Sequence, residues 1–143
     1  MDLRYLRPPS KPRLRSIPVR KKLTVGLDLG TTNTVVGRNF EALRIEGTGT
    51  AMPLAVAYPP SGATLIGKAA RRRRALDPQN TILSAKRVIG ARWHSSYTAQ
   101  FREHYPYDLV QGHDGGPVFR TRAGIVSPVD VSGTVVRGLC ELT

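Results

Sequence analysis

The sequence is poor in three features that mark specialised classes of protein. Its 143 residues include one cysteine, Cys140, so no internal disulfide can form, and this fits a reducing compartment. No apolar run approaches the roughly 20 residues that cross a bilayer. Acidic residues are scarce, because 10 Asp and Glu stand against 22 Lys and Arg. What is present, including 14 glycines and 11 prolines, is typical of one globular domain with many turns.

Positive charge is concentrated at the start of the chain. Residues 1–22 hold eight basic residues and one acidic residue, Asp2, within a total net charge of +12. The basic residues leave no apolar core for a secretory signal, and four prolines break the amphipathic helix of a transit peptide. We therefore predict a disordered, basic, Pro-rich leader over residues 1–22 and a cytoplasmic location. Contact of this leader with nucleic acid is the less favoured alternative.

The first half of the remaining chain has the composition of short strands. β-Branched and apolar residues, separated by turn residues, predict strands over residues 23–29, 34–38, 42–46, 54–58 and 64–66. The first of these is mostly apolar, so we expect it to be buried on both faces. The first two are joined so tightly that they must be antiparallel neighbours.

The second half changes to a helical period. Residues 68–76 have helical composition, and a second helix is predicted from Asn80 or Thr81 to Ile89. Residues 91–107 show no clear periodicity. A hairpin is predicted for residues 108–120, followed by a helix that Ser127 caps. The apolar stripe of this last helix is Val131, Val135, Leu139 and Leu142.

The turn between the first two strands has the chemistry of a phosphate-binding loop. Gly30 allows a sharp turn, and Thr31, Thr32 and Asn33 offer backbone N–H groups and short polar side chains. Asp28, just before the turn, can hold a magnesium ion through its water ligands. These residues predict a grip for magnesium and phosphate. An ordinary hairpin, in which Thr and Asn satisfy the turn, is the alternative.

Two motifs together carry a family resemblance. Residues 28–33 (Asp-Leu-Gly-Thr-Thr-Asn) resemble the first phosphate loop of the actin-like ATPases, which include sugar kinases and the DnaK-type seventy-kilodalton heat-shock chaperones. Residues 78–81 and 86–90 are similar to the Asn-Pro-x-Asn-Thr…Lys-Arg-x-Ile-Gly segment of the DnaK family. Asp77 takes the place of the first Asn. The resemblance covers residues 23–143 and favours the chaperone family over the sugar kinases.

The resemblance implies a fold and a set of ligands. The expected fold is α/β: part of an actin-like, ribonuclease-H-like ATPase lobe with a mixed sheet and flanking helices. Residues 23–143 would be the N-terminal, incomplete portion of a nucleotide-binding domain. The implied cofactors are ATP and Mg²⁺, with Asp28 as the magnesium-linked acid that acts through water. Gly30 would form the tight turn, and Thr31, Thr32 and Asn33 would lie against the phosphates.

The family has a lysine that reaches the γ-phosphate, but this chain has no lysine at the matching position. Counting from Gly67, that position is Arg71. We predict that Arg71 and Asp28 are both catalytic residues. Arginine keeps the charge but presents a planar fork in place of a compact ammonium group. Lys68 and Arg72 are candidates to substitute. A solvated basic face of a helix is the alternative for all these side chains.

The resemblance also implies a function. The chain is expected to be an ATP-binding segment of a DnaK-like chaperone for ATP-dependent protein folding, with unfolded clients and co-chaperones as partners. The second phosphate loop of the family, Asp-x-Gly-Gly-Gly, is absent, and residues 114–116 are predicted to be a hairpin turn. We therefore expect a fragment with weak or no ATP binding and impaired or no hydrolysis.

Two other functions remain open from the sequence. One is a non-enzymatic basic module in which residues 1–22 and residues 71–74 bind nucleic acid or protein. The other is a sugar-kinase fragment, which rests on residues 28–32 alone.

Overall fold

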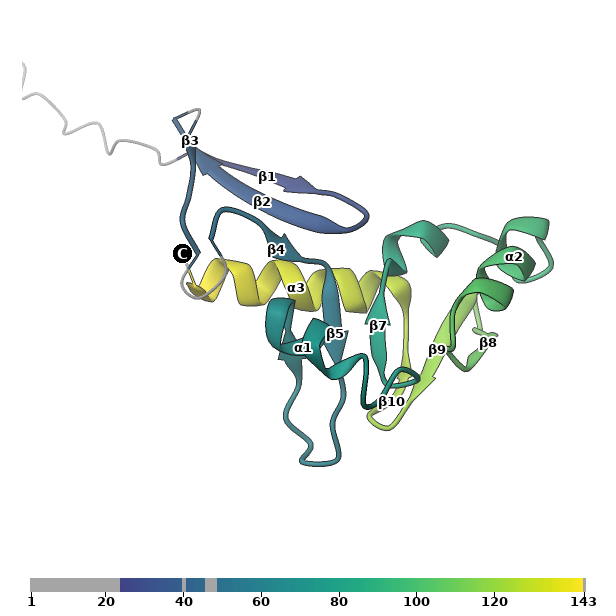
Figure 1. Ribbon diagram of the computed structural model, residues 1–143. Helices are drawn as coiled ribbons and strands as arrows, with labels where there is room; N and C mark the ends of the chain where they lie inside the picture. Colours follow the sequence, from purple (N-terminus) through teal and green to yellow (C-terminus); the bar gives the residue numbers. More distant parts are fainter. Residues whose placement is uncertain (1–23, 40, 46–48, 143) are drawn as a thin grey trace, which may run out of the picture.

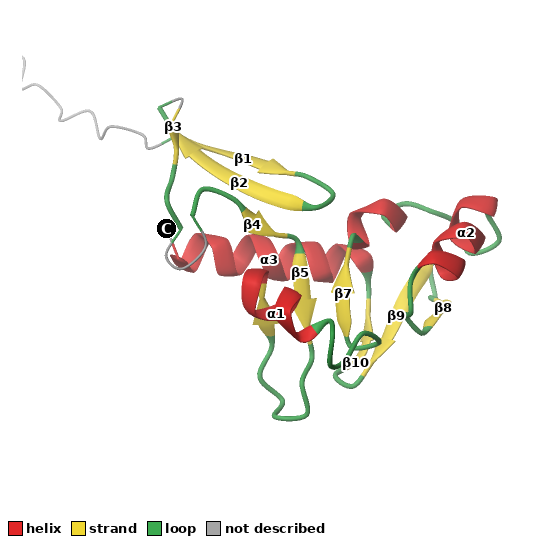
Figure 2. Ribbon diagram, in the orientation of Figure 1, coloured by secondary structure: helices red, strands yellow, loops and turns green. Residues whose placement is uncertain are grey.

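The chain folds as an α/β protein around one long helix. The computed structural model describes residues 24–39, 41–45 and 49–142. The predicted leader over residues 1–22 lies outside these residues. Figure 1 shows helix α3, Pro128–Leu142, running across the middle of the molecule with sheets on several sides. Within the described residues the strands form three small sheets, and Figure 2 shows how helices and strands alternate around α3.

The first sheet holds the predicted phosphate turn. Its strands are β1 (Val25–Leu29), β2 (Asn33–Arg38), β3 (Glu41–Ala42) and β4 (Met52–Pro53). The antiparallel pairing of β1 with β2 is confirmed, with Leu29 opposite Thr34. The strand predicted over residues 42–46 was too long: Ile45 forms only an isolated bridge to Gly49, and residues 46–48 lie outside the description.

The prediction that the first strand is buried on both faces was wrong. Val25 is 48 % exposed and Leu27 is 43 % exposed. Among the described strands, β1 pairs only with β2, so it forms an edge of its sheet. An apolar sequence indicates that a strand can be buried, but burial needs a second layer, and the described elements supply none over this face.

The second sheet forms the interior of the molecule. It consists of β5 (Ala55–Ala57), β6 (Leu65–Ile66) and β7 (Thr81–Leu83), in the order β6-β5-β7. All three residues of β5 are fully buried. The strand predicted over residues 54–58 is therefore confirmed as β5, whereas β4, just before it, was not predicted. Helix α1, Gly67–Arg73, confirms the predicted helix after residue 67, and its Ala70 packs against β5.

The helix predicted from Asn80 or Thr81 to Ile89 was wrong. Thr81 and Ile82 lie in β7, where they pair with Ala57 and Val56 of β5. A short 3₁₀ helix, η1 (Ala85–Val88), follows. Between them Ser84 has φ +59°, a left-handed conformation that an α-helix cannot contain. The tertiary pairing with β5 outweighs the helical spacing of the apolar residues, because it buries Thr81 and Ile82 completely.

The third sheet lies at the far end of α3 from the chain terminus. Its strands are β8 (Leu109–Gln111), β9 (Pro117–Thr121) and β10 (Gly124–Val126), so the predicted hairpin is confirmed and β10 was not predicted. Helix α2, Ser96–His104, was also missed. Its periodicity is weak because only Thr98 and Phe101 of its nine residues are buried. A cap shows its start, since Ser95 accepts a hydrogen bond from the Thr98 N–H at 3.2 Å.

Helix α3 begins with the predicted capping residues. The Asp130 N–H donates to Ser127 Oγ at 3.0 Å, and the Ser127 N–H donates to Asp130 Oδ2 at 3.2 Å. This reciprocal pair satisfies backbone groups that the first turn of a helix leaves unpaired.

The inner face of α3 packs tightly against the second sheet. Val131, Val135 and Leu139 are fully buried, whereas Leu142, predicted in the same stripe, is 45 % exposed. A Cβ atom on Gly138 would lie 2.1 Å from Ile66 Cδ1, so this glycine sets how closely the helix approaches β6. The fold class predicted from the sequence is confirmed, and every pairing between described strands is antiparallel. Across the described residues, none of the helices has the length and apolar character needed to span a membrane.

Candidate phosphate-binding site

The predicted phosphate turn is a tight hairpin between β1 and β2. The Gly30 N–H donates to the Asn33 carbonyl at 3.0 Å, and Thr31 and Thr32 are the exposed residues between them. A Cβ atom on Gly30 would lie 2.5 Å from the Asn33 carbonyl oxygen. Any other residue would therefore force the turn open, so glycine is required here by close approach of the backbone.

The turn stands on a rigid support. The Leu54 N–H donates to the Thr32 carbonyl at 2.8 Å, and Asn33 is paired with Pro53 of β4. Behind the turn, Thr34 is fully buried, and its Oγ1 has no hydrogen-bond partner among the residues that the structure describes. The exposed tip is thus held from behind by buried residues of β2 and β4, which restrict the movement of its N–H groups and hydroxyls.

Asp28 lies on β1, two residues before the turn. It is paired with Val35 in the ladder, and its side chain is exposed. Its carboxylate takes part in none of the ion pairs between described residues. An exposed carboxylate close to exposed hydroxyls and N–H groups can share a hydrated divalent cation with a phosphate.

Lys86 joins the second motif to this turn. Its Nζ donates a hydrogen bond to the carbonyl oxygen of Leu29, immediately before Gly30, from 57 residues away in the sequence. The pairing of β7 with β5 places η1 in reach of the turn, and Lys86 lies on η1. Sequence reasoning included Lys86 in the second motif but gave it no role. Its position in that motif was the signal from which a role for Lys86 could have been predicted.

Arg71 lies near the turn. Within the described residues, no hydrogen bond or ion pair joins Arg71 to the turn. It is an exposed residue of α1, and with Thr32 it lines a cavity of about 370 Å³. Lys68 and Arg72, the predicted substitutes, do not line this cavity. The structure therefore brings Arg71 and Thr32 to one cavity, while Lys86 is the basic residue that reaches the backbone of the turn.

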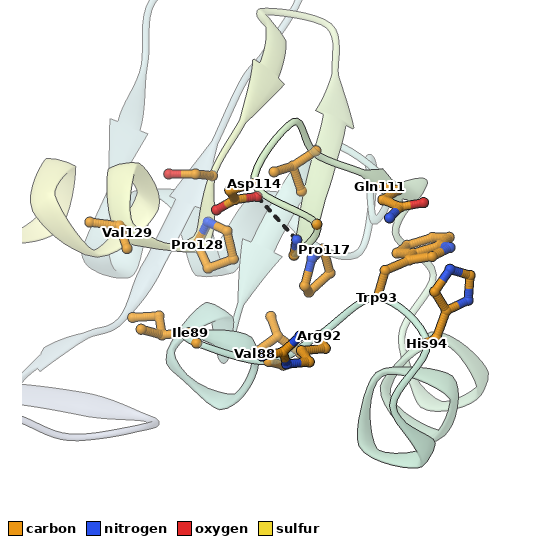
Figure 3. Close-up of a pocket in the computed structure, with 16 residues that line it drawn as sticks. Val88, Ile89, Arg92, Trp93, His94, Gln111, Asp114, Pro117, Pro128 and Val129 are labelled. Carbon is orange, nitrogen blue, oxygen red and sulfur yellow. Dashed lines mark hydrogen bonds between the residues drawn. The ribbon is translucent and has the colours of Figure 1, made fainter.

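A larger cavity, of about 680 Å³, lies elsewhere and has different chemistry (Figure 3). It is bordered by residues 88–94, the β8–β9 turn and the start of α3, and none of the predicted phosphate-binding residues lines it. Residues 114–116 form part of its wall as the predicted hairpin turn, where Asp114 Oδ1 accepts a hydrogen bond from the Gly116 N–H at 3.0 Å. The larger cavity and the predicted phosphate turn are therefore separate features of the surface.

The fold and the turn together define part of an actin-like ATPase lobe. A glycine-dependent hairpin at the start of an α/β lobe presents threonines and an acid, and a lysine from a later segment meets it. Residues 24–143 match the family model described as Hsp70 protein, and the chain belongs to the Hsp70 family.

Similar proteins agree with this assignment. The chain is 37 % identical over 126 residues to a chaperone protein HscA homolog of Azotobacter vinelandii, covering 85 % of this chain and 20 % of that protein. It is 38 % identical over 134 residues to a homolog from Cupriavidus pinatubonensis, covering 91 % of this chain and 21 % of the relative. The chaperone protein HscA of Klebsiella pneumoniae is 36 % identical over 134 residues, with the same two shares of 91 % and 21 %. The chain thus spans about a fifth of the length of the curated relatives it matches.

Proposed function

We propose that this chain is the segment of an Hsp70-type chaperone that binds the phosphates of Mg-ATP, in a protein that assists folding at the expense of ATP. The observation that carries this proposal is the contact between Lys86 and the Leu29 carbonyl. It brings the two motifs of the family resemblance to one place, and that place is a turn with exposed hydroxyls. Membership of the Hsp70 family supports the same function and favours it over a sugar kinase.

The turn fits a phosphate group. A side chain at Gly30 would collide with the Asn33 carbonyl, so the backbone itself forms the surface that an anion meets. Thr31 and Thr32 are exposed at its tip, and the ammonium group of Lys86 adds positive charge at its base. Donors that are held in advance by the β1–β2 ladder cost little to organise when the ligand binds.

Each residue of the turn has a proposed role. Gly30 keeps the turn closed, and the N–H and hydroxyl groups of Thr31 and Thr32 donate hydrogen bonds to phosphate oxygens. Asn33 fixes the second side of the turn through its carbonyl. Asp28 would hold a magnesium ion through water, and a bound magnesium ion supplies neutralisation of the phosphate charge.

Lys86 and Arg71 share the basic part of the proposed site. Lys86 is a compact cation already at the backbone of the turn, so we propose that it turns toward the terminal phosphate when nucleotide binds. Arg71 retains its predicted catalytic role as a proposal, supported by the cavity that it lines with Thr32. Hydrolysis by this chain is expected to be impaired or absent.

The wider role is also a proposal. The relatives are named as chaperones, so unfolded protein clients and co-chaperones are the proposed partners, and the predicted cytoplasmic location belongs with them. No specific client is implied by any residue of the turn.

The experiment that tests the proposal is a titration of the isotopically labelled chain with Mg-ATP, followed by amide NMR. We expect weak binding, with shifts centred on Thr31, Thr32 and Asn33. Gly30→Ala and Lys86→Ala should each weaken binding by about tenfold or more, because charged hydrogen bonds contribute about 1.5–3 kcal/mol.

Arg87→Ala is the matched control, because Arg87 is the exposed neighbour of Lys86 in η1. It should change the affinity by less than about twofold. The proposal fails if shifts occur away from the turn, or if Arg87→Ala and Lys86→Ala weaken binding equally. A micromolar affinity measured by calorimetry would overturn the expectation that the chain binds ATP weakly.

A further inference from the structure

Helix α2 carries a row of aromatic residues, one of which is exposed. Tyr97, Phe101 and Tyr105 are spaced four residues apart, so they lie on one side of the helix. Phe101 is buried, and its ring stacks on Tyr105 with centroids 4.3 Å apart. Tyr97 is 47 % exposed, and it takes part in none of the ring contacts between described residues. The row therefore packs into the core at one end and presents the Tyr97 ring to solvent at the other.

An open cavity lies between this row and η1. It has a volume of about 290 Å³ and is lined by Arg87, Tyr97, Gln100, Phe101, His104 and Tyr105. Arg87 is an exposed residue of η1, whereas the other lining residues belong to α2 and its C-terminal end. Figure 1 shows α2 at the outer end of the molecule, away from β1 and β2, and no residue of the phosphate turn lines this cavity. The fold thus places an arginine and an exposed tyrosine beside one cavity, apart from the phosphate turn.

The surroundings of this cavity are basic. Residues 84–107 include four Lys and Arg residues and one acidic residue, Glu103, in a chain with a net charge of +12. No Asp or Glu lines the cavity. The ion pairs between described residues use Arg120 and Arg122, so within the described part of the chain Arg87 has no carboxylate partner. A cation without a carboxylate beside an exposed ring favours a ligand that carries both negative charge and a flat apolar surface.

A second arginine lies against an aromatic ring at the start of the same helix. The guanidinium carbon of Arg102 is 4.8 Å from the centroid of the Trp93 ring. Arg102 is exposed and Trp93 is half-buried. Trp93 is four residues before Tyr97, so the two rings lie close together along the chain. Arginine beside an aromatic ring is a combination that proteins use to hold bases and phosphates of a single strand.

We propose that Arg87, Trp93, Tyr97 and Arg102, here called the α2 surface, bind single-stranded nucleic acid without sequence preference. A base stacks on the exposed ring of Tyr97, and Arg87 donates hydrogen bonds to the phosphate beside that base. Single strands are favoured over duplexes, because unpaired bases are free to lie on an aromatic side chain. An acidic peptide would match the arginines but would leave the Tyr97 ring without a flat partner. The α2 surface does not include the phosphate turn, so this proposal is independent of the proposed function.

The test is a titration of a fluorescently labelled oligothymidylate with the full chain, followed by anisotropy. A length of about ten nucleotides suits the usual site size of such surfaces. Tyr97→Ala should weaken binding by about fivefold to a hundredfold, the effect of losing one stacked base. Tyr97→Phe keeps the ring and should leave the affinity within about twofold of the parent value. Equal weakening by Tyr97→Ala and Tyr97→Phe would overturn stacking on the ring.

Arg87→Ala tests the phosphate contact through its salt dependence. Each phosphate contact with a single strand contributes about 0.7 to the slope of log affinity against log salt concentration. Arg87→Ala should reduce the slope by about this amount. Tyr97→Ala should leave the slope unchanged, because it removes no charge.

Arg72→Ala is the matched control for charge. Arg72 is exposed on α1 and does not line the cavity, so its removal should leave the affinity within about twofold. Equal weakening by Arg72→Ala and Arg87→Ala would show attraction by net charge alone and would overturn the proposal. The circular dichroism spectrum confirms that each variant is folded.

Competition experiments identify the class of ligand. Unlabelled single strands should displace the probe at lower concentration than a duplex of the same length. Polyglutamate that displaces the probe as well as a single strand of equal charge would indicate an acidic protein partner and overturn the proposal. Oligouridylate of the same length distinguishes RNA from DNA, and tighter binding of either one supports the proposal.

Lys86 and Arg87 separate this proposal from the proposed function. Lys86→Ala should lower Mg-ATP affinity and leave oligothymidylate affinity within about twofold, because Lys86 does not line the cavity. Arg87→Ala should have the opposite effect. Loss of both affinities in either variant would overturn a separate α2 surface. If the parent chain binds oligothymidylate but not Mg-ATP, the proposed function fails and the α2 surface is supported.

Discussion

The β1–β2 hairpin and the β5–β6–β7 sheet differ most in how their side chains are buried. Val56 and Ile82 of the sheet are fully buried beneath α3, whereas Val25 and Leu27 of the hairpin are 48 % and 43 % exposed. The hairpin nevertheless carries the proposed phosphate chemistry. The residues that stabilise the fold and those of the proposed phosphate turn therefore lie in different regions. The turn is held by backbone hydrogen bonds to neighbouring segments.

This difference has a structural reason. An exposed turn must present N–H and hydroxyl groups to a ligand, and those groups cannot also be buried. The Thr32 carbonyl and the Leu29 carbonyl tie the turn to Leu54 and Lys86, which belong to better packed segments. The buried sheet thus positions the open turn. Four substitutions test this difference, beginning with the one that should destabilise the chain most.

Phe119→Ala should have the largest effect on stability. Phe119 is fully buried and meets Phe101 and Tyr107 edge to face, with ring centroids 6.5 and 5.5 Å away. Its removal should lower the free energy of unfolding by about 3–5 kcal/mol, measured by urea unfolding. Leu27→Ala in the hairpin should cost less than about 1 kcal/mol. Equal losses for the two variants would contradict the division between a buried core and an open hairpin.

Tyr107→Phe should have the next largest effect. Its hydroxyl accepts from the Leu83 N–H at 2.8 Å, which joins the start of β8 to β7, and burial raises the pKa of this hydroxyl. Removing the acceptor leaves a backbone donor unpaired, at about 1–3 kcal/mol of unfolding free energy. Tyr105→Phe is the control, because its ring stacks on Phe101 and no hydrogen bond of its hydroxyl is present in the described part of the chain. A similar loss in both variants would show that the hydrogen bond between Leu83 and the Tyr107 hydroxyl is not the cause.

Two glycines of α3 give a matched pair. Gly138→Ala places a Cβ atom against Ile66, whereas a Cβ atom on Gly133 meets nothing within 4 Å. Alanine is favoured over glycine in a helix by about 0.5–1 kcal/mol, so Gly133→Ala should stabilise the chain by that amount. Gly138→Ala should be less stable than Gly133→Ala by about 1–2 kcal/mol, because the helix must shift or Ile66 must move. Thermal unfolding of both variants checks this difference, and equal midpoints would show that α3 is not closely packed on β6.

Asp77→Asn should have the smallest effect, and one that depends on pH. The pKa of Asp77 is lowered below its ordinary value of 3.8 by hydrogen bonds from Asn80 and from Arg122, whose Nη1 lies 2.6 Å from Asp77 Oδ2. A lowered pKa in the folded state stabilises the chain above the ordinary pKa, and this contribution is lost as the pH falls through the folded value. Arg122 is 41 % exposed, so we expect only about 0.5–1 kcal/mol at pH 7.

Urea unfolding at pH 7 and at pH 3 measures this effect. The difference between the parent chain and Asp77→Asn should shrink at the lower pH, because the carboxylate of the unfolded chain, with its ordinary pKa, becomes protonated there. A difference that grows on acidification would show that the charge of Asp77 does not stabilise the fold.

Local patterns in the sequence were sufficient to predict the elements whose contacts lie close together along the chain. The tight β1–β2 turn, the β8–β9 hairpin and the capped start of α3 each depend on residues within a few positions of one another. β7 could not be predicted in this way, since Ile82 pairs with Val56, far back in the sequence. Ser84 and its left-handed backbone also carry no local sequence signal of the kind that glycine provides.

The candidate site shows the same difference between local and long-range contacts. Residues 28–33 were predicted as a phosphate turn from the sequence because the turn residues are contiguous, and the structure confirms the turn itself. The contact of Lys86 with Leu29 was not predicted, because it depends on how β7 and η1 are placed by the second sheet. The cavity that joins Arg71 and Arg74 to Thr32 likewise exists only in the folded chain.

The Asp77–Arg122 contact should also affect which residues occur together at these two positions among relatives. Arg122, between β9 and β10, donates to the Tyr58 carbonyl at 2.8 Å and to Asp77, and its backbone N–H donates to Asn80 Oδ1 at 2.7 Å. The family pattern has asparagine where this chain has Asp77, and asparagine needs no cationic partner. We therefore expect Hsp70 relatives with aspartate at this position to carry arginine or lysine opposite it more often than relatives with asparagine. Position 122 would then be a covarying partner of the second motif.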